Sequence, residues 1–177
     1  IRKQILGVAL KTGGCYLAQA CSSAEIIASL YTRVMNLGPS VGSWEPIPFP
    51  GVPGPDNMDY QRGSSYNGAP APDKDRFFVS CCHYASVIYA ALAETGRISP
   101  DCMDKFNVDG WNMEMIGAEH SPGFENTRSQ AARLMPASAA ATPASAMFCS
   151  VTVSCRKVRP GSAFRQPVTT SWIISSL

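Results

Sequence analysis

The stretch "DKDRFFVSCCHYASVIYAALAETGRIS", residues 73–99, carries the strongest local signals for the fold. Its apolar run "RFFVS" predicts a short strand, since aromatic and β-branched residues favour an extended backbone. His83 comes next, and "HYASVIYAALAETG" predicts a helix over about 84–95 that is closed by the following glycine. Ser99 as N-cap and Pro100 at the first helical position predict another short helix.

Two helices are expected before this stretch. "IRKQILGVALKT" places most of its apolar residues on one helical face, so we expect a helix over about 1–12 that stops at Gly13. Ser22 followed by Glu25 has the pattern of a capping box and predicts a second helix over about 23–37. Because the chain begins inside an expected helix and without Met, we also expect that an upstream piece is missing.

Two long loops are expected. Residues 38–72 hold eight prolines and six glycines, which excludes a helix or a central strand. Four aromatic residues suggest that this loop packs on the rest of the chain: Trp44, Phe49, Tyr60 and Tyr66. A second loop, "NVDGWNMEMIGAEHSPGFEN", contains His120, and His83 and His120 are the two histidines of the whole sequence.

The charge distribution divides the chain. All 13 acidic residues occur up to Glu125, together with nine basic ones, so this part has a net charge of −4. The remainder has six basic residues and no acidic one. A basic tail is one signature of a nucleic-acid-binding module. Because the tail has few cations and too few aromatic side chains for base stacking, we expect no nucleic-acid partner.

The seven cysteines have no Cys-x-x-Cys spacing, and their number is odd. This pattern favours free thiols in a reducing cytoplasm over a disulfide scaffold or a zinc site. No apolar window has the length of a membrane helix, so we expect a cytoplasmic protein without a membrane partner. Nucleophilic catalysis by Cys82 with His83 is conceivable chemistry, although neighbours at a helix start rarely point at each other.

Three blocks occur in the order and spacing found near the start of transketolases: "SSAEIIASLY", "DKDRFFVSCCHYASVIYAALAETGRIS" and "GAEHSPGFENT". Residues 1 to about 127 therefore resemble the bacterial transketolase-like group, in which the amino-terminal half can be a separate subunit. The resemblance implies the α/β fold that binds thiamine diphosphate. It also implies transfer of two-carbon ketol units between sugar phosphates, with Mg²⁺ (or Ca²⁺) as metal and a homodimer or a carboxy-terminal subunit as partner.

The resemblance also gives individual residues a role. His83 matches the histidine that lies near the cofactor diphosphate and the substrate, and His120 matches a histidine that contacts the donor sugar. Gly123 is expected near the cofactor. Imidazole exchanges protons near neutral pH, which suits catalysis on sugar oxygens. Tyr16 stands where the family has its first histidine, and this departure puts one substrate contact in doubt.

The tail after about residue 128 departs from the family. The family's metal site uses an Asp from a Gly-Asp-Gly block, but this tail contains no carboxylate. Read one frame over with suitable codons, "VTVSCRKVR" from Val151 gives Asp-Gly-Glu-Leu-Gln-Glu-Gly-Gln, the family's metal-binding block. "VTTSWIIS" from Val168 gives His-His-Lys-Leu-Asp-Asn-Leu, another family block at the right separation. A naturally divergent tail is the alternative.

These observations define the expected organisation. Residues 1–127 are expected to be a truncated amino-terminal thiamine-diphosphate-binding domain, and residues 128–177 an out-of-frame tail. The chain itself is expected to be mostly helical with few strands and an irregular tail. "MFCSVTVSC" has the composition of a strand, but nothing after it is expected to pair with it. Without the metal-binding block, the isolated chain is expected to be inactive, and a non-catalytic frameshifted fragment is the alternative to an enzyme.

Overall fold

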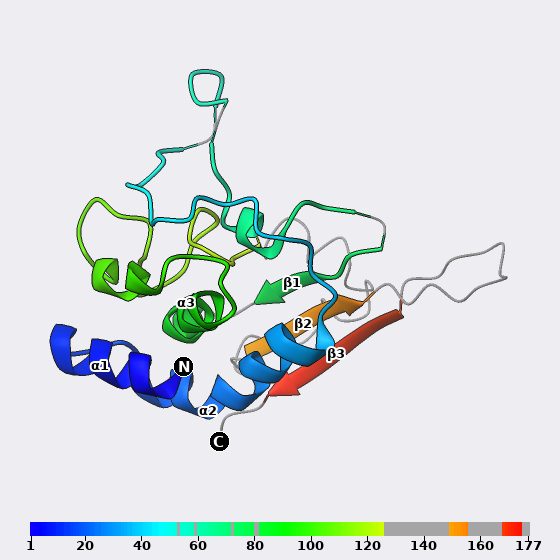
Figure 1. Ribbon diagram of the computed structural model, residues 1–177, viewed down its shortest axis with the longest axis horizontal. Coiled ribbons are helices and arrows are strands. Elements are labelled where there is room, and N and C mark those ends of the chain that lie inside the picture. Colours follow the sequence, from blue (N-terminus) through cyan, green and yellow to red (C-terminus); the bar gives the residue numbers. More distant parts are fainter. Residues whose placement is uncertain are drawn as a thin grey trace, which may run out of the picture.

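The computed structural model describes residues 1–52, 54–58, 60–71, 73–79, 82–125, 149–155 and 168–174. Three α-helices occur in this part: α1 (Arg2–Thr12), α2 (Leu17–Ser29) and α3 (Ala85–Glu94). Four shorter helical turns accompany them: η1 (Leu30–Val34), η2 (Gly63–Asn67), η3 (Cys82–Tyr84) and η4 (Pro100–Lys105). Three strands complete the described elements: β1 (Arg76–Val79), β2 (Cys149–Cys155) and β3 (Val168–Ile174). Figure 1 shows α1 and α2 below α3, with the strands beside them.

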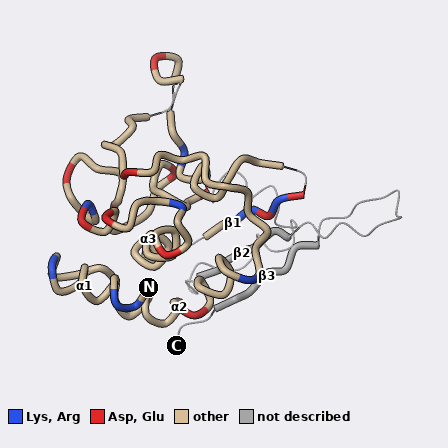
Figure 2. The backbone as a smooth tube through the Cα atoms, viewed as in Figure 1, with Lys and Arg blue, Asp and Glu red and all other residues tan. Residues whose placement is uncertain are grey.

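Helix α3 is the centre of the core. All residues from Ala85 to Ala93 are buried, and α1, α2 and η4 all pack against this helix. Its four alanines are small enough to let neighbouring backbones approach closely. Glu94, at its carboxyl end, is its one charged residue, so Figure 2 shows an almost uninterrupted tan helix. The predicted strand and helix at 76–80 and 84–95 are therefore confirmed within one or two residues.

Helix α1 also follows its prediction. Ile5 and Val8 are its buried residues, and Gly13 ends it in the left-handed conformation with φ 76°. The Gly13 amide donates to the Ala9 carbonyl at 3.0 Å, which satisfies one of the carbonyls left open at a helix end. The short helix η4 is confirmed as well, because the Ser99 hydroxyl accepts a hydrogen bond from the Asp101 amide.

Replacing Gly7 by alanine is expected to stabilise the protein by about 0.5–1 kcal/mol. Gly7 lies on the exposed side of α1, and an added Cβ would meet no atom within 4 Å. Alanine would therefore lower the entropy of the unfolded chain without a steric cost in the folded one. Urea unfolding followed by circular dichroism measures the change, and a lower midpoint than that of the unsubstituted chain would contradict it.

The predicted start of the second helix is wrong. Helix α2 begins at Leu17, and Ser22 lies inside it with its hydroxyl donating to the Gln19 carbonyl at 2.9 Å. Ser22 therefore caps no helix end. Tyr16 precedes the helix in the left-handed conformation with φ 52°, a turn that no capping pattern in the sequence announces. Helix from Leu17 onward therefore takes the place of the N-cap expected at Ser22.

The helix also ends earlier than predicted. After Ser29 the chain continues as the π-helical turn η1, which the Met35 amide closes on the Leu30 carbonyl at 2.9 Å. Beyond it, the Asn36 amide donates to the Asp75 carboxylate at 2.8 Å, and the Asp75 amide donates to the Asn36 carbonyl at 3.0 Å. This pairing holds the chain extended beside the start of β1, which is why the helix does not reach residue 37.

The proline-rich loop packs on the core through part of its aromatic set. Tyr66 is completely buried, whereas Trp44 and Phe49 are about half exposed. The proline-rich loop also contacts the loop that contains His120. Pro48 forms an antiparallel bridge with Trp111, and the Phe49 amide donates to the Gly110 carbonyl at 2.8 Å. The expectation that this loop is anchored on the protein is thus confirmed for Tyr66.

The three strands form an antiparallel sheet in the order β1-β2-β3. Arg76 lies opposite Ser154, and Cys149 lies opposite Ile174. Strand β2 agrees with the composition of "MFCSVTVSC", but the expectation that nothing pairs with it is wrong, because β3 does. The prediction of an irregular tail is therefore wrong for these two segments. Their Val, Thr and Ile residues favour an extended backbone. The remaining tail lies outside the described residues, and the α/β fold of the cofactor-binding family stays a prediction.

Candidate functional site

His83 lies in the turn η3 immediately before α3, and its ring is in edge contact with the ring of Tyr16, with 4.7 Å between centroids. The Ser86 hydroxyl donates to the Cys15 carbonyl at 3.2 Å and so holds the segment before α2 on the first turn of α3. Tyr16 has a left-handed backbone, which is uncommon for residues other than glycine and is often kept where function requires it. The structure thus brings together two residues that the sequence singled out separately.

His120 lies on the loop after η4 and has a different set of partners. Its Nε2 atom pairs with Oε1 of Glu114, and the Ser121 hydroxyl donates to the other oxygen of Glu114 at 2.6 Å. The ring of Phe49 is in edge contact with the imidazole at 4.8 Å. Because the His120 side chain is 12% exposed, carboxylate and aromatic ring together fix its orientation. This arrangement presents an oriented imidazole next to a carboxylate and a hydroxyl.

Glu114 is itself anchored on the core. The hydroxyl of Tyr89, a fully buried residue of α3, donates to the Glu114 carbonyl at 3.0 Å. Burial raises the pKa of Glu114, but hydrogen bonds from His120 and Ser121 outweigh burial and leave this pKa below its ordinary value. Glu114 and Phe49 also line an open pocket of about 260 Å³ together with residues 107–111. The side chains that orient His120 therefore face a space in which a small polar molecule fits.

Replacing Glu114 by glutamine is expected to lower the free energy of unfolding by about 1 kcal/mol at pH 7. A carboxylate with a lowered pKa stabilises the fold above pH 4.5, and this contribution is lost as the pH falls through the folded pKa. The difference between the two proteins should therefore shrink below pH 4.5. Urea unfolding at several pH values measures it, and a difference that grows toward acid pH would contradict the assignment.

The two histidine sites are tied to each other through the backbone. The Gly117 amide donates to the Cys82 carbonyl at 3.0 Å, so the loop that carries His120 lies against the turn that carries His83. A Cβ at Gly117 would lie 2.1 Å from the ring of Phe124, which requires glycine at this crossing. The structure assigns the two imidazoles separate ring partners, and each partner comes from a distant part of the sequence.

Gly123 has a packing role in the structure. It is buried with φ 83°, and an added Cβ would lie 2.7 Å from Cγ2 of Ile88 in α3. Its amide donates to the Gly63 carbonyl at 2.9 Å, and its carbonyl accepts from Nδ2 of Asn67 at 2.9 Å. Both backbone groups are thus used within the chain. The predicted cofactor contact at Gly123 stays a prediction.

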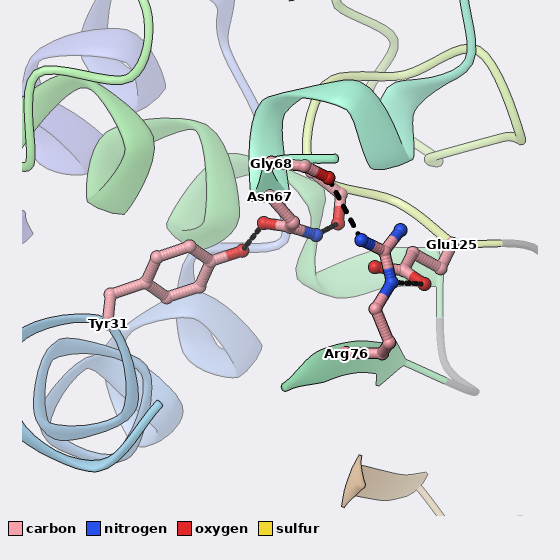
Figure 3. A network of polar contacts seen from close by, with 6 residues as sticks. Tyr31, Asn67, Gly68, Arg76 and Glu125 are labelled. Atoms are coloured by element: carbon pink, nitrogen blue, oxygen red, sulfur yellow. Dashed lines mark hydrogen bonds and ion pairs between the residues drawn. The ribbon is translucent and has the colours of Figure 1, made fainter. Parts of the chain in front are cut away.

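A buried polar network was missed by the sequence reading (Figure 3). Arg76 donates from Nε to Glu125 at 2.9 Å and from Nη1 to the Gly68 carbonyl at 2.9 Å. The Tyr31 hydroxyl donates to Oδ1 of Asn67, also at 2.9 Å. Burial raises the pKa of Glu125, which Arg76 partly opposes, and burial raises the pKa of Tyr31. Glu125 drew attention in the sequence only as the last carboxylate, and no local signal links it to Arg76.

The described residues do not fit the metal that the resemblance implies. Within the parts of the chain that the structure describes, no group of three or more His, Cys, Asp or Glu side chains could hold a metal ion. A Mg²⁺ or Ca²⁺ ion needs a cluster of oxygen ligands. No step of a reaction is therefore assigned to a metal on these residues. Among the same residues, no helix is long and apolar enough to cross a membrane.

Comparison with known proteins gives one informative similarity. The chain is 28% identical over 128 residues to the "Putative uncharacterized transketolase family protein y4mO" of Sinorhizobium fredii (strain NBRC 101917 / NGR234). The aligned part covers 72% of this chain and 36% of that protein, so the chain spans about a third of its relative's length. No family model and no solved structure matches the chain. The similarity supports a transketolase-like relationship at the level of the family.

Proposed function

We propose that this chain derives from the amino-terminal part of a transketolase-like enzyme that uses thiamine diphosphate to transfer two-carbon ketol units between sugar phosphates. The observation that carries the proposal is the similarity over 128 residues to a protein named as a transketolase family member. The three sequence blocks around α2, α3 and His120 agree with it, since they share their order and spacing with that family.

In this proposal the two imidazoles handle protons on the sugar. Glu114 lines the open pocket and pairs with His120, and the imidazole would exchange a proton with a hydroxyl of a sugar bound there. Tyr16 packs on His83 and occupies the place of a family histidine, so it offers a phenol hydroxyl where the family offers an imidazole. Thiamine diphosphate, when bound by the complete enzyme, supplies the carbanion chemistry that the side chains of this chain lack.

The proposal includes the origin of the tail. Residues from about 128 onward are an out-of-frame translation, and the lost block would have supplied the carboxylate ligand of the metal. The antiparallel pairing of β2 with β3 is compatible with this origin, because apolar and β-branched residues pair readily whatever their ancestry. Resequencing of the coding DNA tests the point, and an unchanged reading frame across codon 128 would contradict it.

The proposal extends to partners. The complete enzyme would act as a homodimer or with a carboxy-terminal subunit, and sugar phosphates would be its substrates. We propose a cytoplasmic location for it on the basis of the same resemblance to the family. The basic-tailed binding module stays an untested alternative, because all six basic residues of the tail lie outside the described residues.

The isolated 177-residue chain is expected to show no ketol transfer in a coupled assay with thiamine diphosphate and Mg²⁺. The matched protein is the full gene product read in the restored frame, which is expected to turn over with its partner subunit present. In that protein, replacing His120 by alanine should lower kcat about 10²-fold. Turnover by the 177-residue chain would overturn the predicted inactivity, and an inert restored protein would overturn the proposed function itself.

A further inference from the structure

A second open pocket, of about 400 Å³, lies away from both histidines, between the proline-rich loop and the end of α3. Its lining residues come from these two segments: Pro39, Ser40, Gly42, Trp44, Thr95, Gly96 and Arg97. The loop and the helix end are joined by direct contacts, since Arg97 donates from Nη1 to the carbonyls of Gly38 at 2.9 Å and Tyr66 at 3.0 Å. The pocket is thus built on packed segments.

Arg97 brings a positive charge that no carboxylate balances within the described residues. Its hydrogen bonds there go from Nη1 to two backbone carbonyls, and it forms no ion pair with the described acidic residues. Burial lowers the pKa of its guanidinium, which is the response of a cation without a nearby anion. The Nε–H and Nη2 donors have no acceptor in the same part of the chain, and this edge of a guanidinium binds carboxylate or phosphate in two parallel hydrogen bonds.

Two other lining residues complete the chemistry of the pocket. The Ser40 hydroxyl is buried and has no hydrogen-bond partner among the described residues, although most buried polar groups have one. Trp44 is 54% exposed and offers an apolar ring surface. A purely structural Arg97, which supports the carboxyl end of α3 and holds the loop, accounts for the Nη1 contacts. It leaves the unpartnered Ser40 hydroxyl unexplained.

We propose that this pocket binds a small organic oxyanion, a phosphate or a carboxylate, through Arg97 and the Ser40 hydroxyl, with the organic part of the ligand against Trp44. The anion would balance the charge of Arg97 and give the Ser40 hydroxyl its acceptor. The ring of Trp44 would cover an apolar group next to the anion. The site is separate from the ketol-transfer site proposed above and does not depend on it.

The test is a titration of the full chain followed by the ¹⁵N–¹H signals of the Arg97 Nε–H and the Trp44 indole N–H. The probes are phenyl phosphate, phenylacetate, inorganic phosphate and benzyl alcohol. Saturable shifts of both signals are expected with phenyl phosphate or phenylacetate. The probe that binds more tightly identifies the oxyanion. Benzyl alcohol, which lacks the anion, should leave the Arg97 signal unmoved. Shifts that do not saturate with either anion would overturn the proposal.

Three variants make the assignment specific. Ser40→Ala removes only the unpartnered hydroxyl, and we expect it to weaken anion binding about tenfold while the fold is kept. Trp44→Ala should weaken phenyl phosphate more than inorganic phosphate. Arg97→Lys keeps the positive charge but loses the pair of parallel N–H donors of the guanidinium. Its control is Arg33→Lys, which changes an exposed arginine of η1. Unchanged affinity in both Ser40→Ala and Arg97→Lys would overturn the site.

Discussion

Replacing Glu125 by alanine is expected to lower the free energy of unfolding by about 3 kcal/mol. The Glu125 side chain is 4% exposed, and its carboxylate pairs with Nε of Arg76, which is 20% exposed, at 2.9 Å. Alanine would leave the Arg76 guanidinium largely buried without its counter-ion and would open a cavity beside it. Urea unfolding at pH 7 measures the loss. The control is Glu94→Ala, which removes an exposed ion pair with the amino terminus and should cost no more than about 0.5 kcal/mol.

The variant Glu125→Gln removes the charge of this side chain but keeps its shape, so it measures the contribution of the charge alone. A carboxyl whose pKa is raised in the fold binds more protons in the folded than in the unfolded state between pH 4.5 and the folded pKa. The contribution of Glu125 to stability therefore falls as the pH rises through this window, and the glutamine variant should lack this slope. Equal losses in Glu125→Ala and Glu94→Ala would show that the buried network does not stabilise the fold.

Replacing Gly63 by alanine is expected to cost about 3 kcal/mol or more, because its Cβ would meet backbone that has no room to move. The added atom would lie 1.8 Å from the Ser121 carbonyl oxygen. The Gly63 amide donates to the Glu119 carbonyl at 2.8 Å, so the substitution would push the His120 loop away from η2. The histidine site should therefore loosen together with the fold.

The matched control for this prediction is Gly54→Ala. A Cβ at Gly54 would meet nothing within 4 Å, so the change should stay within about 0.5 kcal/mol of the unsubstituted chain. Thermal unfolding of both variants gives the comparison, and a two-dimensional NMR spectrum of the His120 ring signals reports on the loop. Equal melting temperatures for Gly63→Ala and Gly54→Ala would contradict the close packing of η2 on this loop.

The sequence by itself determined the elements whose signals are local. The apolar run before His83 predicts β1, the alanine-rich run after it predicts α3, and Ser99 with Pro100 predicts η4. Each of these signals acts within a few residues, through side-chain shape or through a hydrogen bond to the nearest backbone. The capping pattern at Ser22 failed because the preceding turn at Tyr16 started the helix earlier, and nothing in the sequence marks that turn.

Only the tertiary structure decided which side chains meet. Glu114 orients His120, Tyr16 packs on His83, and Arg76 pairs with Glu125, 49 positions along the chain. The pairing of β2 with β3 is likewise a contact that only the tertiary structure shows. These contacts are set by how the loops cross the buried surface of α3, and their pairing has no local pattern in the sequence. The sequence therefore singled out both histidines as candidates, but the partners that fix their geometry follow from packing.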